Sequence, residues 1–377
     1  MKKALVTCHV GRHYKKFGHY DIEALKELGY KVDFAANFDL PIDKVEENAG
    51  IKLHQIDFSR NPFSLKNIKA YKQLKKLIDT NCYDIIHCQS PVGGVITRIA
   101  AKEARKRGTK VIYTAHGFHF YKGAPFYYWL LFYPIEKYLS KYTDTIITIN
   151  LEDYEIAKKN FKNCHNIQHI TGIGIDTKKF LNTTNDQEKK ELKKFLGFQE
   201  KDFIMIYTAR LDKNKNQLFL IKAMKKIVKK NSDIHLLLVG QDELNGKCQK
   251  KTKQYHLNKN IHFLGYRNDI PQLLKMSDVA VSASKREGMP LNIMEAVCCN
   301  KPVIALDCRG INNLIKNNVN GIIISNTKQR EKKFIENIES IYHKDIYFKN
   351  IKDYNKEIIK KIDIKEISKM VKKQLRT

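Results

Sequence analysis

The chain has 377 residues, of which 42% are hydrophobic and 29% are charged. This balance excludes an intrinsically disordered protein, and the length favours two globular domains. The formal net charge of +29 suggests an anionic partner, either a nucleic acid, an anionic lipid surface or a phosphorylated substrate. The lysines are spread along the whole chain, however, so solvated lysine-rich helix faces explain the charge equally well.

The eight cysteines indicate a reducing compartment. They show no CxxC pairing and several stand in apolar segments, so we expect buried free thiols and neither disulfides nor a zinc site. No run reaches the roughly 18 apolar residues that would span a bilayer. Residues 4–10 begin like a signal peptide, but His9 and Arg12 interrupt the apolar run, which favours a first strand. We therefore expect a cytoplasmic protein that can associate peripherally with the cytoplasmic face of the membrane.

The first half of the chain alternates short apolar runs with longer amphipathic segments, which is the pattern of a parallel α/β domain. The expected strands are residues 4–10, 31–35, 85–88, 110–114 and 145–149. The expected helices between them are residues 19–28, 65–80, 93–107 and 127–141.

A turn at residues 114–117, with the sequence TAHG, follows the fourth of these strands. Its His116 can donate a hydrogen bond to a sugar hydroxyl or to a developing charge if two domains close over a common cleft. A lone histidine beside a glycine is more often structural, and that alternative stays open. His119 stands close by, but no cluster of Cys, Asp or Glu accompanies the two histidines, so we expect no metal site.

Residues 124–134 form a short aromatic run that lies between Lys122 and Lys137. Tryptophan and tyrosine suit a membrane interface, so the run is a candidate contact for a membrane surface or for a lipid-linked acceptor. A buried helix explains the composition equally well.

After a glycine-punctuated stretch at residues 170–176, which suits a hinge, the alternation restarts. The expected strands are residues 203–207, 235–239, 261–264, 278–283 and 303–306. The expected helices are residues 217–229, 247–255 and 291–299, and residues 334–375 are also helical in period. Two successive doubly wound domains fit this pattern better than one large sheet.

Two cations, Arg210 and Lys215, follow the first strand of the second half. At the carboxyl end of a strand they can clamp a diphosphate, because arginine supplies a bidentate fork and lysine a point charge. Farther along, Gly265 precedes Tyr266 and Arg267 in a turn that can present groups to a nucleobase. Taken alone, surface charge and an ordinary strand-to-helix turn are the commoner explanations.

The most informative segment holds two carboxylates, Glu287 and Glu295, in a strand–loop–helix–strand pattern. Its loop opens at the carboxyl end of a strand, where such sheets bind ligands. The backbone amides of Leu291 and Asn292 at the start of the helix suit a phosphate. The two carboxylates can accept hydrogen bonds from sugar hydroxyls, although spacing alone favours two solvated glutamates.

Together these segments resemble the retaining glycosyltransferases of family 4, over nearly the whole chain. The landmarks are residues 209–211 with Lys215, residues 287–290 with Glu295 and Ala296, the turn 114–117, and residues 174–176 with Phe180. Residues 116–134 are especially similar to the branch that builds bacterial capsular polysaccharides, exopolysaccharides or lipid-linked glycans.

The resemblance implies the GT-B fold, with two Rossmann-like doubly wound domains that face a central cleft. The acceptor-binding domain would comprise residues 1–172 and the nucleotide-sugar-binding domain residues 173–355. Residues 356–377 would form a C-terminal helix that packs back on the first domain.

The resemblance also implies a role for each landmark residue. Arg210 and Lys215, with the amides of Leu291 and Asn292, would bind the donor diphosphate, and Glu295 the ribose. Glu287, Gly288 and Met289 would contact the donor sugar, and Tyr266 and Arg267 the nucleobase. His116 would touch the sugar near the reacting carbon, so that His116 and Glu287 are the expected catalytic residues.

Such enzymes transfer a hexosyl group with retention and without a metal or other cofactor, and the absence of a DxD motif agrees with this. The implied donor is a nucleotide sugar, most simply a UDP-sugar, and the implied acceptor is a glycan or an undecaprenyl-diphosphate-linked glycan of a surface polysaccharide. Two departures stand out. The first loop has only Gly11 where many relatives have two glycines, so its acceptor or phosphate role is open, and Asn313 stands where relatives often carry an acidic residue.

Two alternatives remain at this stage. A UDP-sugar 2-epimerase shares the GT-B fold and would release UDP without an acceptor. A basic nucleic-acid-binding protein would show a basic stripe with interleaved aromatic residues. The even spread of lysine argues against the second alternative, so we expect no nucleic-acid partner.

Overall fold

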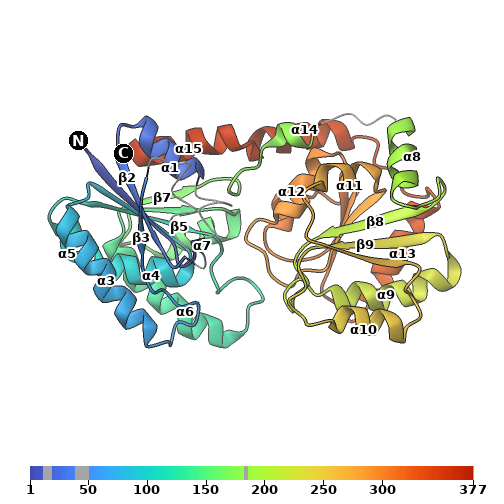
Figure 1. Ribbon diagram of the computed structural model, residues 1–377, viewed down its shortest axis with the longest axis horizontal. Helices are drawn as coiled ribbons and strands as arrows, with labels where there is room; N and C mark the ends of the chain where they lie inside the picture. The colour runs from blue at the N-terminus through green and yellow to red at the C-terminus, as the bar shows by residue number, and fades with distance from the viewer. Residues whose placement is uncertain (12–18, 39–50, 182–185, 377) are drawn as a thin grey trace. The chain divides into compact units, whose positions relative to one another are not determined.

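The computed structural model describes residues 1–11, 19–38, 51–181 and 186–376 (Figure 1). The chain divides into two compact units. Unit 1 comprises Met1–Gly174 and Ile364–Thr377, and unit 2 comprises Ile175–Asp363. The boundaries therefore fall at Gly174 and Asp363, whereas the sequence placed them at residues 172 and 355.

Unit 1 is built on a parallel sheet, whose order in the described part of the chain is β3-β2-β1-β4-β5-β6-β7. The inner strands are continuous apolar runs because helices cover both faces of the sheet. The strands are β1 (Lys3–Thr7), β2 (Lys31–Ala36), β3 (Lys52–Gln55), β4 (Ile85–Gln89), β5 (Lys110–Ala115), β6 (Thr145–Thr148) and β7 (Asn166–His169). The sequence did not predict β3 and β7, since both are short edge strands with polar, partly exposed residues.

Helices lie on both sides of this sheet, and Figure 1 shows α1 and α15 on one side with α3 and α4 on the other. They are α1 (His19–Glu27), α3 (Lys66–Asn81), α4 (Pro91–Ala100), α5 (Lys102–Lys106), α6 (Phe126–Leu139), α7 (Leu151–Asn160) and α15 (Ile364–Arg376). The helix expected at residues 93–107 is divided between α4 and α5, which meet at Ala101. The C-terminal α15 packs on α1, where Lys372 Nζ lies 2.5 Å from Glu27 Oε2.

Unit 2 has a second parallel sheet, in the order β10-β9-β8-β11-β12-β13 among the described residues. The strands are β8 (Phe203–Thr208), β9 (Ile234–Val239), β10 (Ile261–Gly265), β11 (Val279–Ser282), β12 (Val303–Leu306) and β13 (Gly321–Ile324). The helices are α8 (Asp186–Phe195), α9 (Gln217–Lys230), α10 (Lys247–Gln254), α11 (Ile270–Met276), α12 (Leu291–Cys298), α13 (Arg330–Tyr342) and α14 (Ile351–Ile362). The 3-10 turns of the described chain are η2 (Ser140–Tyr142), η3 (Thr177–Lys179) and η4 (Ile311–Asn313).

The two sheets each confirm the doubly wound α/β architecture that the sequence predicts. The last stretch, which the sequence predicts to be helical from residue 334 onward, comprises the three helices α13, α14 and α15. Of these, α14 belongs to unit 2 and α15 to unit 1, and Asp363 lies between them in an extended conformation.

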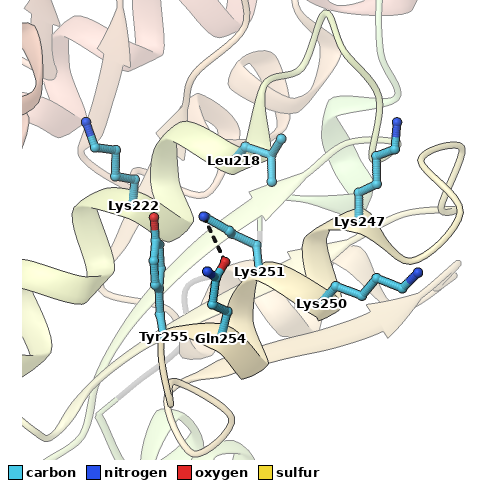
Figure 2. Close-up of a pocket in the computed structure, with 7 residues that line it drawn as sticks. All are labelled: Leu218, Lys222, Lys247, Lys250, Lys251, Gln254 and Tyr255. Atoms are coloured by element: carbon cyan, nitrogen blue, oxygen red, sulfur yellow. Dashed lines mark hydrogen bonds between the residues drawn. The ribbon is translucent and has the colours of Figure 1, made fainter.

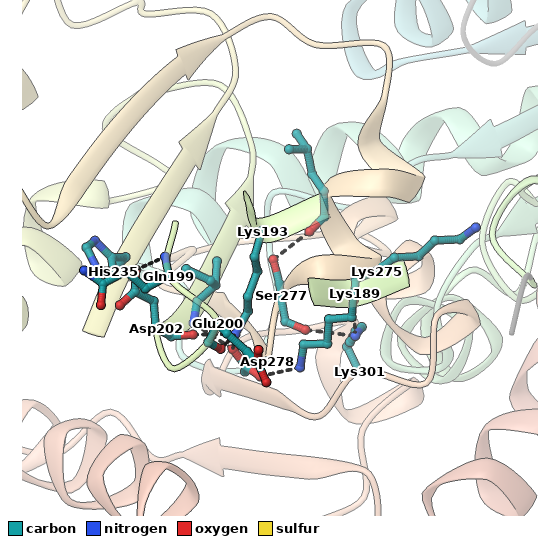
Figure 3. A network of polar contacts seen from close by, with 12 residues as sticks. Lys189, Lys193, Gln199, Glu200, Asp202, His235, Lys275, Ser277, Asp278 and Lys301 are labelled. Carbon is teal, nitrogen blue, oxygen red and sulfur yellow. Dashed lines mark hydrogen bonds and ion pairs between the residues drawn. The ribbon is translucent and has the colours of Figure 1, made fainter. Parts of the chain in front are cut away.

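A lysine-rich network fixes α8 against the amino ends of β8 and β11 (Figure 3). Asp278 accepts hydrogen bonds from the backbone amide of Ile204 at 2.8 Å and from Lys189 Nζ at 2.5 Å, and Lys193 Nζ lies 3.4 Å away. Beside them, Lys301 Nζ donates to the carbonyl oxygens of Lys275 and Ser277, and burial lowers the pKa of Lys301 to about 8. Ligands of parallel sheets bind at the opposite, carboxyl edge, so we assign this network to stability.

Candidate active site

Two loops at the carboxyl edge of the unit 2 sheet are joined by hydrogen bonds. The loop after β8 carries Asn214, whose carbonyl oxygen accepts from the amide of Lys285 at 2.8 Å. The side chain of Asn214 donates to the carbonyl of Arg286 at 2.9 Å. Below them the hydroxyl of Tyr207 lies 2.7 Å from Ser284 Oγ. The loop that follows β8 therefore has a fixed position relative to the loop that follows β11.

This arrangement brings Lys215 and Glu287 into contact. Lys215 Nζ lies 2.5 Å from Glu287 Oε1, and the two side chains are only 19% and 12% exposed. The main chain of both residues is also held, because Asp212 Oδ1 accepts from the amide of Lys215 at 2.7 Å and Arg309 Nε donates to the carbonyl of Glu287 at 3.1 Å. The structure thus places a cation and a carboxylate at the edge where the sequence predicts donor binding.

Arg210 lies in the same loop as Lys215, but its guanidinium is occupied by carboxylates. Arg210 Nη1 donates to Glu243 Oε1 at 2.6 Å, and Nη2 lies 3.4 Å from Asp212 Oδ2. The backbone of this loop lies close to the end of β9, since a Cβ on Gly240 would stand 2.2 Å from the carbonyl oxygen of Ala209. A diphosphate at this position would have to compete with Glu243 for the guanidinium.

Glu295 points from α12 toward the end of β8. Thr208 Oγ1 donates to Glu295 Oε2 at 3.5 Å. Burial raises the pKa of Glu295 to about 7, and the hydrogen bond from Thr208 opposes this rise. A carboxyl group with this pKa changes its protonation state readily near neutral pH, and it would be stabilised as an anion by hydroxyl donors.

The amino end of α12 lies in the loop that carries Glu287. The first amides of a helix have no acceptor within the helix, so those of Leu291 and Asn292 are available in principle to an anion. Gly288 and Met289 lead into this helix, and Met289 is buried. Gly310, with φ of 84°, packs directly on this turn, because a Cβ on it would stand 2.3 Å from the carbonyl oxygen of Gly288.

Tyr266 and Arg267, the two residues predicted to contact a nucleobase, have different surroundings in the turn after β10. Tyr266 is 72% exposed. Arg267 instead forms a bidentate pair with Asp269, with Nε 2.8 Å from Oδ1 and Nη2 2.5 Å from Oδ2. Tyr266 can therefore offer its ring to a ligand without breaking an ion pair, whereas Arg267 cannot.

In unit 1, His116 is the first member of a chain of polar contacts. His116 Nε2 lies 2.8 Å from Gln89 Oε1, and Gln89 Nε2 donates to Asp21 Oδ2. The buried His87 lies 3.4 Å from Asp21 through Nδ1 and 2.8 Å from Thr114 Oγ1 through Nε2. Burial raises the pKa of Asp21 well above its usual value.

These contacts indicate which ring nitrogen of His116 donates to Gln89. Because Gln89 donates through its nitrogen to Asp21, its oxygen accepts, and His116 Nε2 is the donor. The expected hydrogen bond of His116 to a sugar hydroxyl stays a prediction.

The first loop is described only as far as Gly11. The amide of Gly11 donates to the carbonyl of Asn37 at 2.6 Å, and a Cβ on Gly11 would stand 2.3 Å from the ring of Phe38. Close packing against Phe38 is therefore one reason for a glycine here. Residues 12–14 of the predicted acceptor or phosphate loop lie outside the described residues.

A hollow of about 480 Å³ lies elsewhere on unit 2, between α9 and α10 (Figure 2). It is lined by Leu218, Lys222, Lys247, Lys250, Lys251, Gln254 and Tyr255. None of the predicted site residues lines it, and its lysines are part of the surface charge that the composition shows.

The structure also contains polar residues at the site that the sequence reasoning missed. Thr208 is the last residue of β8 and Gln89 is the last residue of β4. They could have been found by the same signal that indicated Arg210 and His116, which is a position at or just after the end of a strand. Asp21 and Glu243 gave no such signal, because a single acidic residue near a helix or in a loop is typical of a solvated surface.

Comparisons with known proteins show the family of this chain. A family model described as "Glycosyl transferases group 1" matches residues 188–358, and one described as "Glycosyl transferase 4-like" matches residues 4–150. "Putative glycosyltransferase EpsD" of Bacillus subtilis (strain 168) is 40% identical over 343 residues, which cover 91% of this chain and 88% of that protein.

A second relative comes from Escherichia coli. It is the "UDP-Gal:alpha-D-GlcNAc-diphosphoundecaprenol alpha-1,3-galactosyltransferase", 35% identical over 269 residues, 70% of this chain and 68% of that protein. Among solved structures, Anabaena HepE in complex with UDP and glucose is 19% identical with a TM-score of 0.76, and the match covers 100% of both chains. The solved structure supports the fold alone, and these comparisons give no support to the epimerase alternative.

The described residues contain no helix that is long and apolar enough to cross a membrane.

Proposed function

The chain belongs to the group 1 glycosyl transferases and is a glycosyltransferase, and on that premise we propose that it uses a UDP-sugar and a lipid-linked acceptor. The proposed product is a surface polysaccharide or its lipid-linked precursor. The observation that carries the proposal is the contact of Lys215 with Glu287 at the carboxyl edge of the unit 2 sheet, beside Arg210 and the amino end of α12.

The donor would bind across the two joined loops. Lys215 and Arg210 would neutralise the diphosphate, helped by the amides of Leu291 and Asn292, and Glu295 would accept from the ribose hydroxyls. Glu287 would then exchange part of its contact with Lys215 for a hydroxyl of the donor sugar. The exposed ring of Tyr266 would stack on the base.

Two similar proteins support the choice of UDP. The Escherichia coli relative is described as acting on UDP-Gal, and HepE was crystallised with UDP. The same Escherichia coli relative is described as acting on a diphosphoundecaprenol-linked sugar, which supports an undecaprenyl-diphosphate-linked acceptor. An acceptor of this kind would bring the protein to the surface of the membrane.

The proposed transfer retains the configuration of the sugar and needs no metal. The bond between the anomeric carbon and the diphosphate oxygen breaks as the acceptor hydroxyl bonds to the same face of that carbon. The acceptor proton passes to the leaving diphosphate oxygen, so no protein base is required. Charge on the leaving group would be stabilised by Lys215, Arg210 and the α12 amides, while His116 would hold a hydroxyl of the sugar.

The experiment supplies purified protein with UDP-, GDP- and ADP-sugars and a prenyl-diphosphate-linked N-acetylhexosamine. We expect nucleotide release together with an acceptor that is heavier by one sugar, unchanged by EDTA and of retained configuration by NMR. Release of nucleotide with a free sugar and no acceptor product would overturn the transferase function. Preference for GDP- or ADP-sugars would overturn only the donor assignment.

A further inference from the structure

The helix α6 presents an apolar face to solvent along its whole length. Large hydrophobic residues are rarely so exposed: Phe126 is 80% exposed and Leu130 is 64% exposed. Several large apolar side chains exposed on one face of a helix usually mark an interaction site. The exposed apolar residues of α6, which we call the α6 face, are Phe126, Tyr127, Leu130, Leu131, Pro134, Ile135 and Tyr138.

The opposite side of α6 is fixed in the unit 1 core. Trp129 and Tyr133 pack on Phe120, with ring centroids 5.4 Å from it in both cases. The only acidic residue of α6, Glu136, is buried and pairs with Arg98 at 2.8 Å. The sequence left open whether this segment is a buried helix or a membrane contact, and the structure shows that one side of α6 is buried and the other side is exposed.

Basic residues lie at both ends of the α6 face. Lys137 and Lys141 lie at its C-terminal end, with Lys141 Nζ 3.7 Å from the ring centroid of Tyr138. Lys122 precedes the helix and Lys102 lies over the ring of Tyr142. Since Glu136 is buried, α6 itself exposes no negative charge.

We propose that the α6 face docks on the surface of an anionic phospholipid bilayer, with its apolar residues in the headgroup region and its lysines on the lipid phosphates. This inference rests on the proposed function, because a lipid-linked acceptor lies in such a bilayer. Aromatic and aliphatic side chains next to lysines match the composition of interfacial helices. The helix has 14 residues and is too short to span the bilayer.

Charge decides between a bilayer and a second copy of the chain. A twofold dimer through the α6 face would bury Lys137 and Lys141 against a second α6 that exposes no carboxylate to pair with them. An anionic bilayer instead neutralises them. The location also fits, since α6 follows the His116 turn and begins at the carboxyl edge of the unit 1 sheet.

The first test measures sedimentation of the protein with vesicles of phosphatidylglycerol and phosphatidylcholine, and with vesicles of phosphatidylcholine alone. We expect binding to the anionic vesicles, which Leu130→Asp weakens about tenfold or more because it places a charge among the apolar contacts. Phe195→Asp is the matched control, because Phe195 is 84% exposed on α8 of unit 2. We expect it to bind like the wild type.

The second test addresses the charge. Replacing Lys137 and Lys141 together by glutamine should weaken binding to anionic vesicles by about fivefold for each lysine, with a smaller loss in high salt. Replacing Lys247 and Lys250 by glutamine removes the same charge from the hollow of unit 2 and should leave binding unchanged.

Two outcomes would overturn the inference: equal vesicle binding by Leu130→Asp and the wild type, or a dimer in solution that Leu130→Asp dissociates. Failure of the proposed function is measured separately, by UDP binding and by transfer to a short-chain, water-soluble acceptor. Leu130→Asp should retain both. If the wild type binds vesicles but transfers no sugar, the result supports the docking surface and contradicts the proposed function.

Discussion

Lys215 and Glu287 are joined by a contact of 2.5 Å although the chain places them in loops that follow different strands, β8 and β11. A lysine that is already aligned by a carboxylate has little side-chain entropy to lose when a diphosphate binds. Glu287 is likewise oriented, with its carbonyl held by Arg309. The pair therefore prepares the site for the donor before it arrives.

Removing either charge should impair catalysis. We expect Lys215→Met and Glu287→Gln each to lower kcat/KM by about tenfold or more, because each removes a charge-assisted hydrogen bond to the donor. The measurement is steady-state kinetics with the sugar nucleotide that proves active in the comparison of UDP-, GDP- and ADP-sugars. Lys285→Met is the control, since Lys285 is exposed in the same loop and should keep wild-type rates. Near-wild-type turnover in both variants would show that the donor binds elsewhere.

Glu295 should couple nucleotide binding to proton release. Its pKa of about 7 leaves about half of the molecules protonated at pH 7, and ribose hydroxyls that donate to the carboxylate favour the ionised form. Affinity for UDP should thus rise with pH between about 6 and 8. Calorimetry at pH 7 in buffers of different ionisation enthalpy should detect a release of up to about half a proton.

The nucleotide has its own ionisation in this range, and Glu295→Gln separates the two effects. The amide retains an acceptor oxygen but cannot titrate. We expect the variant to release less proton than the wild type at pH 7. Identical proton release in both proteins would remove Glu295 from the ribose site.

The lysine-rich network of unit 2 should govern stability without governing activity. We expect Asp278→Ala to lower the free energy of unfolding by about 3 kcal/mol, because it removes the acceptor of the Ile204 amide and the carboxylate that pairs with Lys189 and Lys193. Urea denaturation gives the value. Asp278→Asn keeps an oxygen for the amide and should lose less. A fall in kcat without a fall in stability would mean that this network acts on the site.

The fold class could be predicted from the sequence because buried parallel strands are continuous apolar runs. The unit β11–α12–β12 is correct almost to the residue, and glycine and proline mark its loop. The pattern failed at three edge strands of the described residues. β3 and β7 carry polar residues, as edge strands often do. β13 is apolar and was still not predicted.

Less of the site could be predicted, and the reason is also physical. Residues at strand ends, such as Lys215 and Glu287, could be found because the edge of a parallel sheet is defined by the strands themselves. What surrounds each side chain depends on residues far away in the chain. The burial of Asp21 and the pairing of Arg210 with Glu243 leave no trace in local sequence. Periodicity likewise could not show that α6 is buried on one side only.

The contact between Gln89 and His116 yields the last prediction. Gln89 orients the imidazole through its oxygen and is itself held by Asp21, so it is a positioning residue rather than a catalytic one. Gln89→Leu should lower kcat about tenfold and change the donor KM little, since His116 belongs to the unit without the donor loops. Gln89→Glu tests the role with a side chain of nearly the same size, and it also removes the amide that donates to Asp21. It keeps an oxygen at 2.8 Å from His116 Nε2, and its negative charge favours the imidazolium, so the histidine pKa measured by NMR should rise, and an apparent pKa of the kcat profile should rise with it. A pH profile identical to that of the wild type would show that Gln89 does not act on the reaction through His116.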